Sequence, residues 1–313
     1  MATAGYSNIQ AAQTTYEALF QKFFSGGFAG QWSMYTREID VLGTQLNIPI
    51  TTSFPQIARM LGTMEWSDIR GLSKTVTPET HAAGIRMKRS QVIGDVSGVV
   101  AQTLADFLAS QARTDSSGIE KEIADLLMAN TWLSYDGVTL LNDSHAFSSG
   151  TGDNLDSAAL SFETYRATKA RMRRFQDERG IVLGVNPTHL MVGPGNERPA
   201  LEITGATRPV AFSATAQDAT SGIVAATAIE NVFAGDTSVI VNPYLGDNAW
   251  FLMDLSKPGL RPLLMGWLEK PKPIVVDEDV YFMAVNNDEY GYMIKGIYTP
   301  DAGIWQLIAG RPV

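Results

Sequence analysis

The most regular pattern of apolar positions lies between residues 93 and 133. Apolar side chains recur there at the spacing of one helix face, from Val96 to Leu108 and again from Ile119 to Leu127. The polar run 115–118 between the two halves ends in glycine and is expected to kink or break the helix. The pattern therefore predicts one long helix or two helices in series.

Upstream of this helix the chain lacks long apolar runs, and Pro and Gly interrupt it repeatedly. Residues 16–24 have helical spacing and stop at a Ser-Gly-Gly turn, which predicts a short helix packed either on its own chain or on a neighbouring subunit. Alternating polar and apolar residues predict extended pieces near 70–77 and 81–92. Two such strands cannot bury a core alone, so we expect this excursion to lie on another part of the chain or on another copy.

Downstream, the chain changes from helix-rich to strand-rich. A basic helix is predicted over 161–178, with Gly180 as its stop. A short strand over 188–193 then leads into a Gly-Pro-Gly turn and a short helix over 196–203. The remaining predicted strands are 238–241, 249–253, 262–268, 273–276, 280–286, 290–298 and 304–308. Helices followed by a run of strands indicate an α+β fold.

Composition narrows the class of protein. The 313 residues are 45% apolar and 18% charged, as in globular chains, and the absence of cysteine excludes disulfides and thiolate metal sites. The net charge of −9 lacks the basic footprint of a protein that reads nucleic acid, but it suits a wall that encloses DNA without holding its phosphates. No apolar run predicts a membrane span, and the N-terminus has no signal-peptide pattern, so we expect folding in the cytoplasm.

Side chains that could perform chemistry are scattered along the chain. The three histidines form no helical metal pair, and neither a phosphate-binding loop nor a nucleophile elbow is present. Asp143 and His145 share a polar loop, for which hydrogen bonding is favoured over a metal or acid–base role. The carboxylates at 277–279 and 288–289 are interpreted as solvated turns or partners for basic residues, not as a glycosidase pair. We therefore predict no catalytic residue, no metal site and no cofactor.

Several short motifs, taken in order, resemble one known family. The run Tyr135-Asp136-Gly137-Val138, followed by Asn142-Asp143-Ser144-His145, is similar to the Tyr-Asp-Gly … His segment of the Mu-like major head subunit family. The segments 176–180, 183–187 and 190–192 follow in that family's order, and 303–310 is similar to its closing strand.

The resemblance extends upstream of these motifs. Trp66, Arg70, Gly84-Ile85 and Asp95 fall where that family has its extended loop and the start of its long helix. The similarity covers most of residues 60–313 in pieces, while residues 200–260 carry no motif.

The resemblance implies the Hong Kong 97-type capsid fold, within the same α+β class. The regions that it implies, in chain order, are an N-terminal arm over 1–45, an extended loop over 46–92, a peripheral domain with the spine helix over 93–158, an axial domain over 159–268, return strands of the peripheral domain over 269–296, and a C-terminal strand of the axial domain over 297–313.

The function that the resemblance implies is that of a major capsid protein of a tailed, double-stranded DNA phage. Copies of the chain are expected to assemble through hexamers and pentamers into an icosahedral head, made in the host cytoplasm and retained in the virion. The packaged DNA would be enclosed without sequence-specific binding, and portal, scaffold or decoration proteins would be further partners. An encapsulin-like nanocompartment shell and an α+β hydrolase remain as alternatives.

The expected contacts between subunits involve charged residues. The basic helix over 161–178 is expected to meet the acidic turn 277–279 of a neighbour. Lys74 could also serve a Lys–Asn cross-link of the kind that some members of this fold lineage form, but the sequence indicates neither an acceptor nor a catalytic Glu. The candidate contact residues are Arg70, Lys74, Arg86, Lys88, Arg173, Arg174, Asp277, Glu278 and Asp279.

Overall fold

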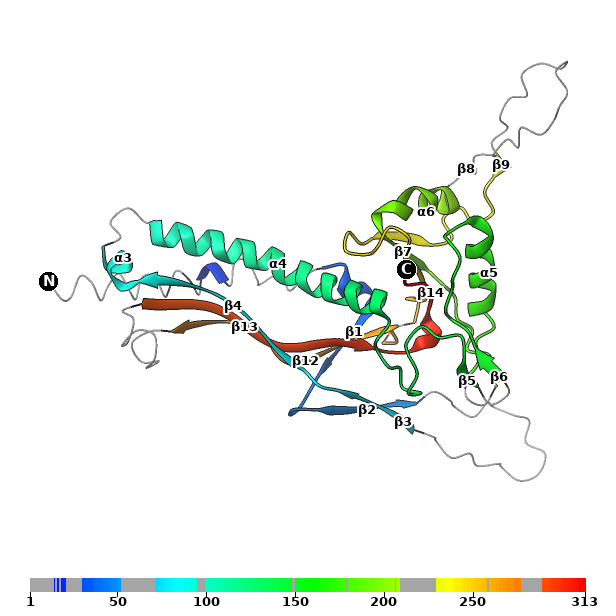
Figure 1. Cartoon of the computed structure of the whole chain (residues 1–313), viewed down its shortest axis with the longest axis horizontal. Helices are drawn as coiled ribbons and strands as arrows, with labels where there is room; N and C mark the ends of the chain where they lie inside the picture. Colours follow the sequence, from blue (N-terminus) through cyan, green and yellow to red (C-terminus); the bar gives the residue numbers. More distant parts are fainter. Residues whose placement is uncertain are drawn as a thin grey trace, which may run out of the picture.

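The structure, a computed structural model, describes residues 14, 16, 18–20, 30–51, 71–94, 99–147, 150–177, 180–205, 207–208, 229–257, 259–276 and 289–313. Figure 1 shows two unlike parts side by side. An elongated part consists of a long helix lying along a sheet of long strands, and a more compact part holds a second sheet with two shorter helices.

The sheet of the elongated part has four strands. Its spatial order is β1 (Thr36–Asp40), β12 (Leu263–Val276), β13 (Glu289–Ala302) and β4 (Glu79–Lys88). β1 runs parallel to β12, and the other two pairs are antiparallel. The register between β12 and β13 shifts twice between Trp267 and Lys272, where Pro271 offers no backbone N–H to the ladder. The predicted strands 262–268 and 273–276 are therefore one strand with an irregular middle.

The long helix α4 (Val99–Ala129) covers one face of this sheet (Figure 1). Leu104 and Leu108 pack on Tyr290 and Tyr292 of β13 in one buried cluster. Of the two predicted alternatives, one long helix is confirmed and a break at 115–118 is not, because the helix runs through this segment without interruption. A glycine in a helix costs only about 1 kcal/mol relative to alanine, which the buried apolar faces on both sides of Gly118 outweigh.

The compact part contains a second four-stranded sheet. Its spatial order is β10 (Ser238–Val241), β7 (His189–Val192), β11 (Trp250–Met253) and β14 (Ile308–Arg311). β11 is buried on both faces and joins the largest core of the molecule together with Leu190, Met191 and Trp305. The predicted strand over 304–308 is wrong at its start, because Trp305–Leu307 form the 3-10 turn η2 and the strand begins at Ile308.

Two helices, α5 (Phe162–Met172) and α6 (Glu197–Thr204), accompany this sheet. Ser161 caps α5, since its hydroxyl accepts a hydrogen bond from the Thr164 backbone N–H. The predicted end of α5 at 178 is wrong, because regular helix stops at Met172 and two tight turns follow. After these turns Phe175 lies in the core against Trp305, with ring centroids 5.4 Å apart.

A hairpin and several short elements complete the described part of the chain. The hairpin of β2 (Leu46–Thr51) and β3 (Gly71–Val76) leaves the body at its base, where Val76 packs on Val41 and Leu264. The remaining elements are α2 (Trp32–Tyr35), α3 (Arg89–Ile93), β5 (His145–Phe147), β6 (Gly150–Gly152), η1 (Pro194–Asn196), β8 (Thr207–Arg208) and β9 (Ile229–Glu230).

The expected excursion before the long helix is only partly two-stranded. Its two extended pieces correspond to β3 and β4, but β3 pairs with β2, whereas β4 pairs with β13 of its own chain. Trp32 and Tyr35, inside the expected arm, lie in the largest core. The expected boundaries at 268 and 296 fall within β12 and β13. The predicted strand 280–286 and most of the predicted helix 16–24 lie outside the described residues.

Candidate assembly surfaces

The segment that follows α4 holds a compact polar cluster. Asn130 ends the helix in the left-handed conformation, with φ of 49°, and its side-chain amide exchanges hydrogen bonds with the backbone of Leu141. Gly137 has a φ of 82° and forms the tight turn between Asp136 and Val138. This turn brings Asp136 to His145, at the start of β5.

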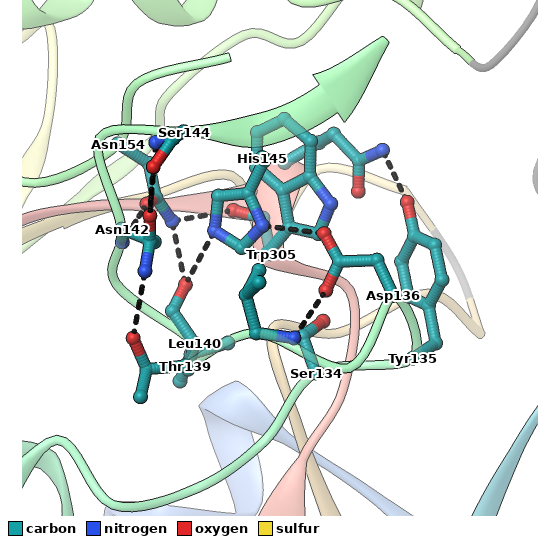
Figure 2. A network of polar contacts seen from close by, with 12 residues as sticks. Ser134, Tyr135, Asp136, Thr139, Leu140, Asn142, Ser144, His145, Asn154 and Trp305 are labelled. Atoms are coloured by element: carbon teal, nitrogen blue, oxygen red, sulfur yellow. Dashed lines mark hydrogen bonds and ion pairs between the residues drawn. The ribbon is translucent and has the colours of Figure 1, made fainter. Parts of the chain in front are cut away.

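His145 is the centre of this cluster (Figure 2). Its Nδ1 lies 2.6 Å from Asp136 Oδ2 and its Nε2 lies 3.2 Å from the Leu140 carbonyl oxygen. A carboxylate and a carbonyl oxygen can only accept hydrogen bonds from the imidazole. The imidazole also stacks flat on Trp305, with centroids 4.0 Å apart and an interplanar angle of 3°.

Asn154 and Gln306 extend the cluster to the end of the chain. Asn154 Nδ2 contacts the carbonyl oxygens of Leu140, Trp305 and Ile308 at 2.8 to 3.2 Å, and Asn154 Oδ1 accepts from the Asn142 backbone. Gln306 Nε2 donates to the Tyr135 hydroxyl. The cluster thus joins the segment after α4 to the η2–β14 segment of the second sheet.

This arrangement supports structure rather than chemistry. His145 and Asn154 are fully buried, so no substrate could reach the imidazole. In the part of the chain that the structure describes, no group of three His, Asp or Glu side chains could hold a metal. The predicted hydrogen-bonding role of His145 is confirmed, although its carboxylate partner is Asp136 and not the neighbouring Asp143.

Lys74, expected at a contact between subunits, is used within its own chain. Its ammonium group lies 2.8 Å from Asp301 Oδ1 of β13 and donates to the Leu133 carbonyl at 2.6 Å. Burial raises the pKa of Asp301, and the nearby Lys74 partly offsets this effect. Lys74 thus ties the base of the hairpin to the body, and its expected contact with another subunit stays a prediction.

Arg86 and Lys88 are exposed on β4, an edge strand of the four-stranded sheet. Arg86 lies 3.7 Å from Glu289, a distance typical of a weak ion pair in solvent. Lys88 is followed by α3, and its backbone N–H donates to Gln91 Oε1. Both side chains are accessible to a neighbouring subunit.

Arg173 and Arg174 are exposed just after α5. Arg173 donates to the Asn186 side-chain oxygen at 3.2 Å. Both arginines border a hollow of about 500 Å³, which Val232, Phe233 and Ala170 also line. The buried Lys169 beside it is neutralised by an ion pair with Asp236.

Four of the candidate contact residues, namely Arg70, Asp277, Glu278 and Asp279, lie outside the described residues. Sequence reasoning also missed one surface. The outer face of α6 exposes Glu197, Leu201 and Glu202, and it borders an open hollow of about 430 Å³. An exposed leucine in a short amphipathic helix was the available signal.

Within the described ranges, none of the helices combines the length and apolarity that a membrane span requires.

The family model that matches this chain and several solved structures similar to it describe phage capsids. A family model described as "Phage capsid protein" matches residues 71–305. Among solved structures, the chain is similar to the bacteriophage PhiM1 mature capsid, at 11% identity and a TM-score of 0.52 over 91% of this chain and 86% of that chain. The capsid of cyanophage P-SCSP1u gives 10% identity and a TM-score of 0.52 over 90% and 88%.

The procapsid of bacteriophage JBD30 aligns at 17% identity and a TM-score of 0.49, over 96% of this chain and 74% of that chain. No curated protein sequence matches the chain.

Proposed function

The chain belongs to the phage capsid protein family and has the Hong Kong 97-type fold, so it is a major capsid protein of a tailed-phage head and not an enzyme. On this premise, we propose that copies of the chain assemble through hexamers and pentamers into a closed shell around double-stranded DNA. The observation that carries the proposal is the family match, which extends from β3 to Trp305 and includes α4 and three strands of each four-stranded sheet.

Within the family, the proposed subtype is the Mu-like major head subunit. The support is that the motif residues on which this resemblance depends lie together in space. Asp136 and His145 form the ion pair, and Trp305 of the closing segment stacks on His145. Separate motifs that converge on one buried cluster are expected when they have a common structural purpose.

The parts of the molecule are assigned to the regions of the fold as follows. The elongated part, with α4 and the sheet β1-β12-β13-β4, is proposed as the peripheral domain. The compact part, with the sheet β10-β7-β11-β14, α5 and α6, is proposed as the axial domain around the capsomer axis. The hairpin β2–β3, which leaves the body at its base, is proposed as the extended loop that lies across a neighbour.

Contacts between subunits are proposed at exposed charged residues. Arg86 and Lys88 on the edge strand β4, and Arg173 and Arg174 after α5, have side chains that another copy can reach. Arg70 and the acidic run Asp277-Glu278-Asp279 remain candidates from the sequence alone. Repeated around a closed shell, individually weak contacts of this kind suffice for assembly.

The DNA contents are proposed to be held without sequence-specific binding. The net charge of −9 would repel phosphates, so the wall retains DNA by enclosure rather than by adhesion. Assembly in the host cytoplasm, with scaffold, portal or decoration proteins as partners, completes the proposal.

The test is to express the chain alone and with the genes beside it, and to examine the product by negative-stain electron microscopy and size-exclusion chromatography. Closed shells or isolated hexamers and pentamers are the expected result. A product that stays monomeric or dimeric even with its neighbouring gene products present would refute the assembly proposal.

A further inference from the structure

One side of the compact part carries a basic surface, called here the α5 hollow. It has a volume of about 500 Å³ and is lined by Arg166, Lys169, Ala170, Arg173, Arg174, Val232, Phe233 and Asp236. Val232 is 82% exposed, so it offers apolar surface to a partner. The α5 hollow therefore combines an apolar floor with a cationic rim.

The positive charge of this rim is not cancelled within the described part of the subunit. Lys169 is paired with Asp236, and Arg166 forms an exposed pair with Glu163 at 2.7 Å. Arg173 contacts only the neutral side chain of Asn186 among its described partners, and Arg174 has no acidic partner there. Two arginines thus remain available to an acidic partner, in a protein with a net charge of −9.

Another side of the same part carries the opposite combination, called here the α6 face. It exposes Glu197 and Glu202 around Leu201, which is 53% exposed. Arg198 is bonded to Glu202 at 2.8 Å, so it neutralises only one of the two carboxylates. Asp247, which lies against Gly195, adds a further exposed negative charge beside this face.

We propose that the α5 hollow of one subunit receives the α6 face of the next subunit around a capsomer, an inference that rests on the proposed assembly into hexamers and pentamers. Figure 1 shows α5 and α6 on two different sides of the compact part. Two different patches that complement each other on one domain form a head-to-tail contact, which is the kind of contact that builds a ring when its rotation closes. A two-fold dimer, by contrast, buries the same patch of both subunits and needs only that one patch.

The fit is both apolar and electrostatic. Leu201 packs on Val232 and Phe233, which removes from water the most exposed apolar side chains of both surfaces. Glu197 and Glu202 then lie against Arg173 and Arg174, and planar guanidinium groups suit carboxylates in such partly buried pairs. Packing supplies the attraction, and the charges fix the orientation and exclude other pairings.

The test is a charge exchange between the two surfaces. One variant carries Arg173→Glu with Arg174→Glu, a second carries Glu197→Lys with Glu202→Lys, and a third carries all four. Particle yield is measured by sedimentation and electron microscopy at about 0.15 M salt, where surface charges act over about 8 Å. Circular dichroism of the unassembled subunits shows whether each variant is folded.

Each two-site variant is expected to lower particle yield at least about tenfold, because like charges then face each other across the contact. The four-site variant is expected to return to within about threefold of the wild type, because the reversed charges again face each other. A control with Arg37→Glu and Lys121→Glu, both exposed and elsewhere, changes as many charges and is expected to assemble normally.

Three results would overturn the inference. The arginine variant could assemble at wild-type yield, which leaves the capsid proposal intact. The four-site variant could stay unassembled although both parents are folded. Reversal at Asp277, Glu278 and Asp279 could restore the arginine variant while reversal on the α6 face does not, which would identify the acidic turn as the partner. If the wild type stays monomeric or dimeric even with its neighbouring gene products present, the assembly proposal fails, and this inference fails with it.

Discussion

Replacement of His145 by phenylalanine tests whether the buried cluster after α4 stabilises the fold. Phenylalanine keeps the flat contact with Trp305, so packing changes little. It removes the donor of Asp136 Oδ2, and the Asp136 side chain is only 12% exposed. The Leu140 carbonyl oxygen still accepts a hydrogen bond from Asn154. The main loss is therefore the hydrogen bond between His145 and the Asp136 carboxylate.

The expected cost can be estimated from these contacts. Removing the hydrogen-bond donor of a buried polar group costs about 1–3 kcal/mol, and more for a charged group, so we expect a loss of about 3 kcal/mol at Asp136. With a denaturant slope of about 3 kcal/mol/M in urea, the unfolding midpoint should fall by about 1 M. Asp143→Asn, an exposed change in the same loop, should cost less than about 0.5 kcal/mol.

The assay is urea unfolding of unassembled subunits followed by tryptophan fluorescence, to which Trp305 contributes directly. Asp136→Ala and the double variant complete a mutant cycle, in which the double variant should cost clearly less than the sum of the two single changes. The reasoning is refuted if His145→Phe behaves like Asp143→Asn, or if the two single costs simply add.

Three further predictions concern α4 and the hairpin. Gly118→Ala should raise the free energy of unfolding by about 0.5–1 kcal/mol, because an added Cβ meets no atom within 4 Å and the helix is continuous there; a loss of stability in urea unfolding would count against that continuity. Burial raises the pKa of Glu122 above its usual 4.5, so the folded state favours the protonated carboxyl group. The contribution of Glu122 to the free energy of unfolding is therefore present at low pH and is lost as the pH rises through the raised pKa. Glu122→Gln should therefore gain stability relative to the wild type between pH 4 and pH 7, and thermal melts with no such pH-dependent difference would contradict this. Lys74→Met leaves the half-buried Asp301 without its cation, so it should lower the free energy of unfolding by about 3 kcal/mol. Amide hydrogen exchange across β3 should become faster in this variant, and the exposed Lys272→Met should show neither effect.

Local patterning determined much of this protein. Apolar spacing over 93–133 specified a helix with one buried face, and alternation specified most of the strands, because these periods follow from backbone geometry alone. The motif Tyr135-Asp136-Gly137 and the later His145 were recognised through their resemblance to a known family, whereas the pairing of His145 with Asp136 instead of Asp143 was not foreseen. The absence of recognisable catalytic motifs likewise pointed to a structural protein, in agreement with the family match.

The errors lie where long-range packing overrides local preference. Gly118 and its polar neighbours favour a break, yet Leu108 and Ile119 are both held against buried surfaces, so the helix continues. The α5 helix stops early because Phe175 gains a place beside Trp305, which is 130 positions away in the chain. No window of sequence contains both residues of such a pair.

Surfaces depended on tertiary structure most of all. The sequence shows which segments are charged, and it indicated Lys74, Arg173 and Arg174 equally as candidates for contacts between subunits. Only the fold decided that Lys74 is occupied by Asp301 within its own subunit, while Arg173 and Arg174 border an open hollow. The physical reason is that a charge becomes a contact surface only when its own chain leaves it exposed and uncompensated, which depends on residues brought together from distant positions.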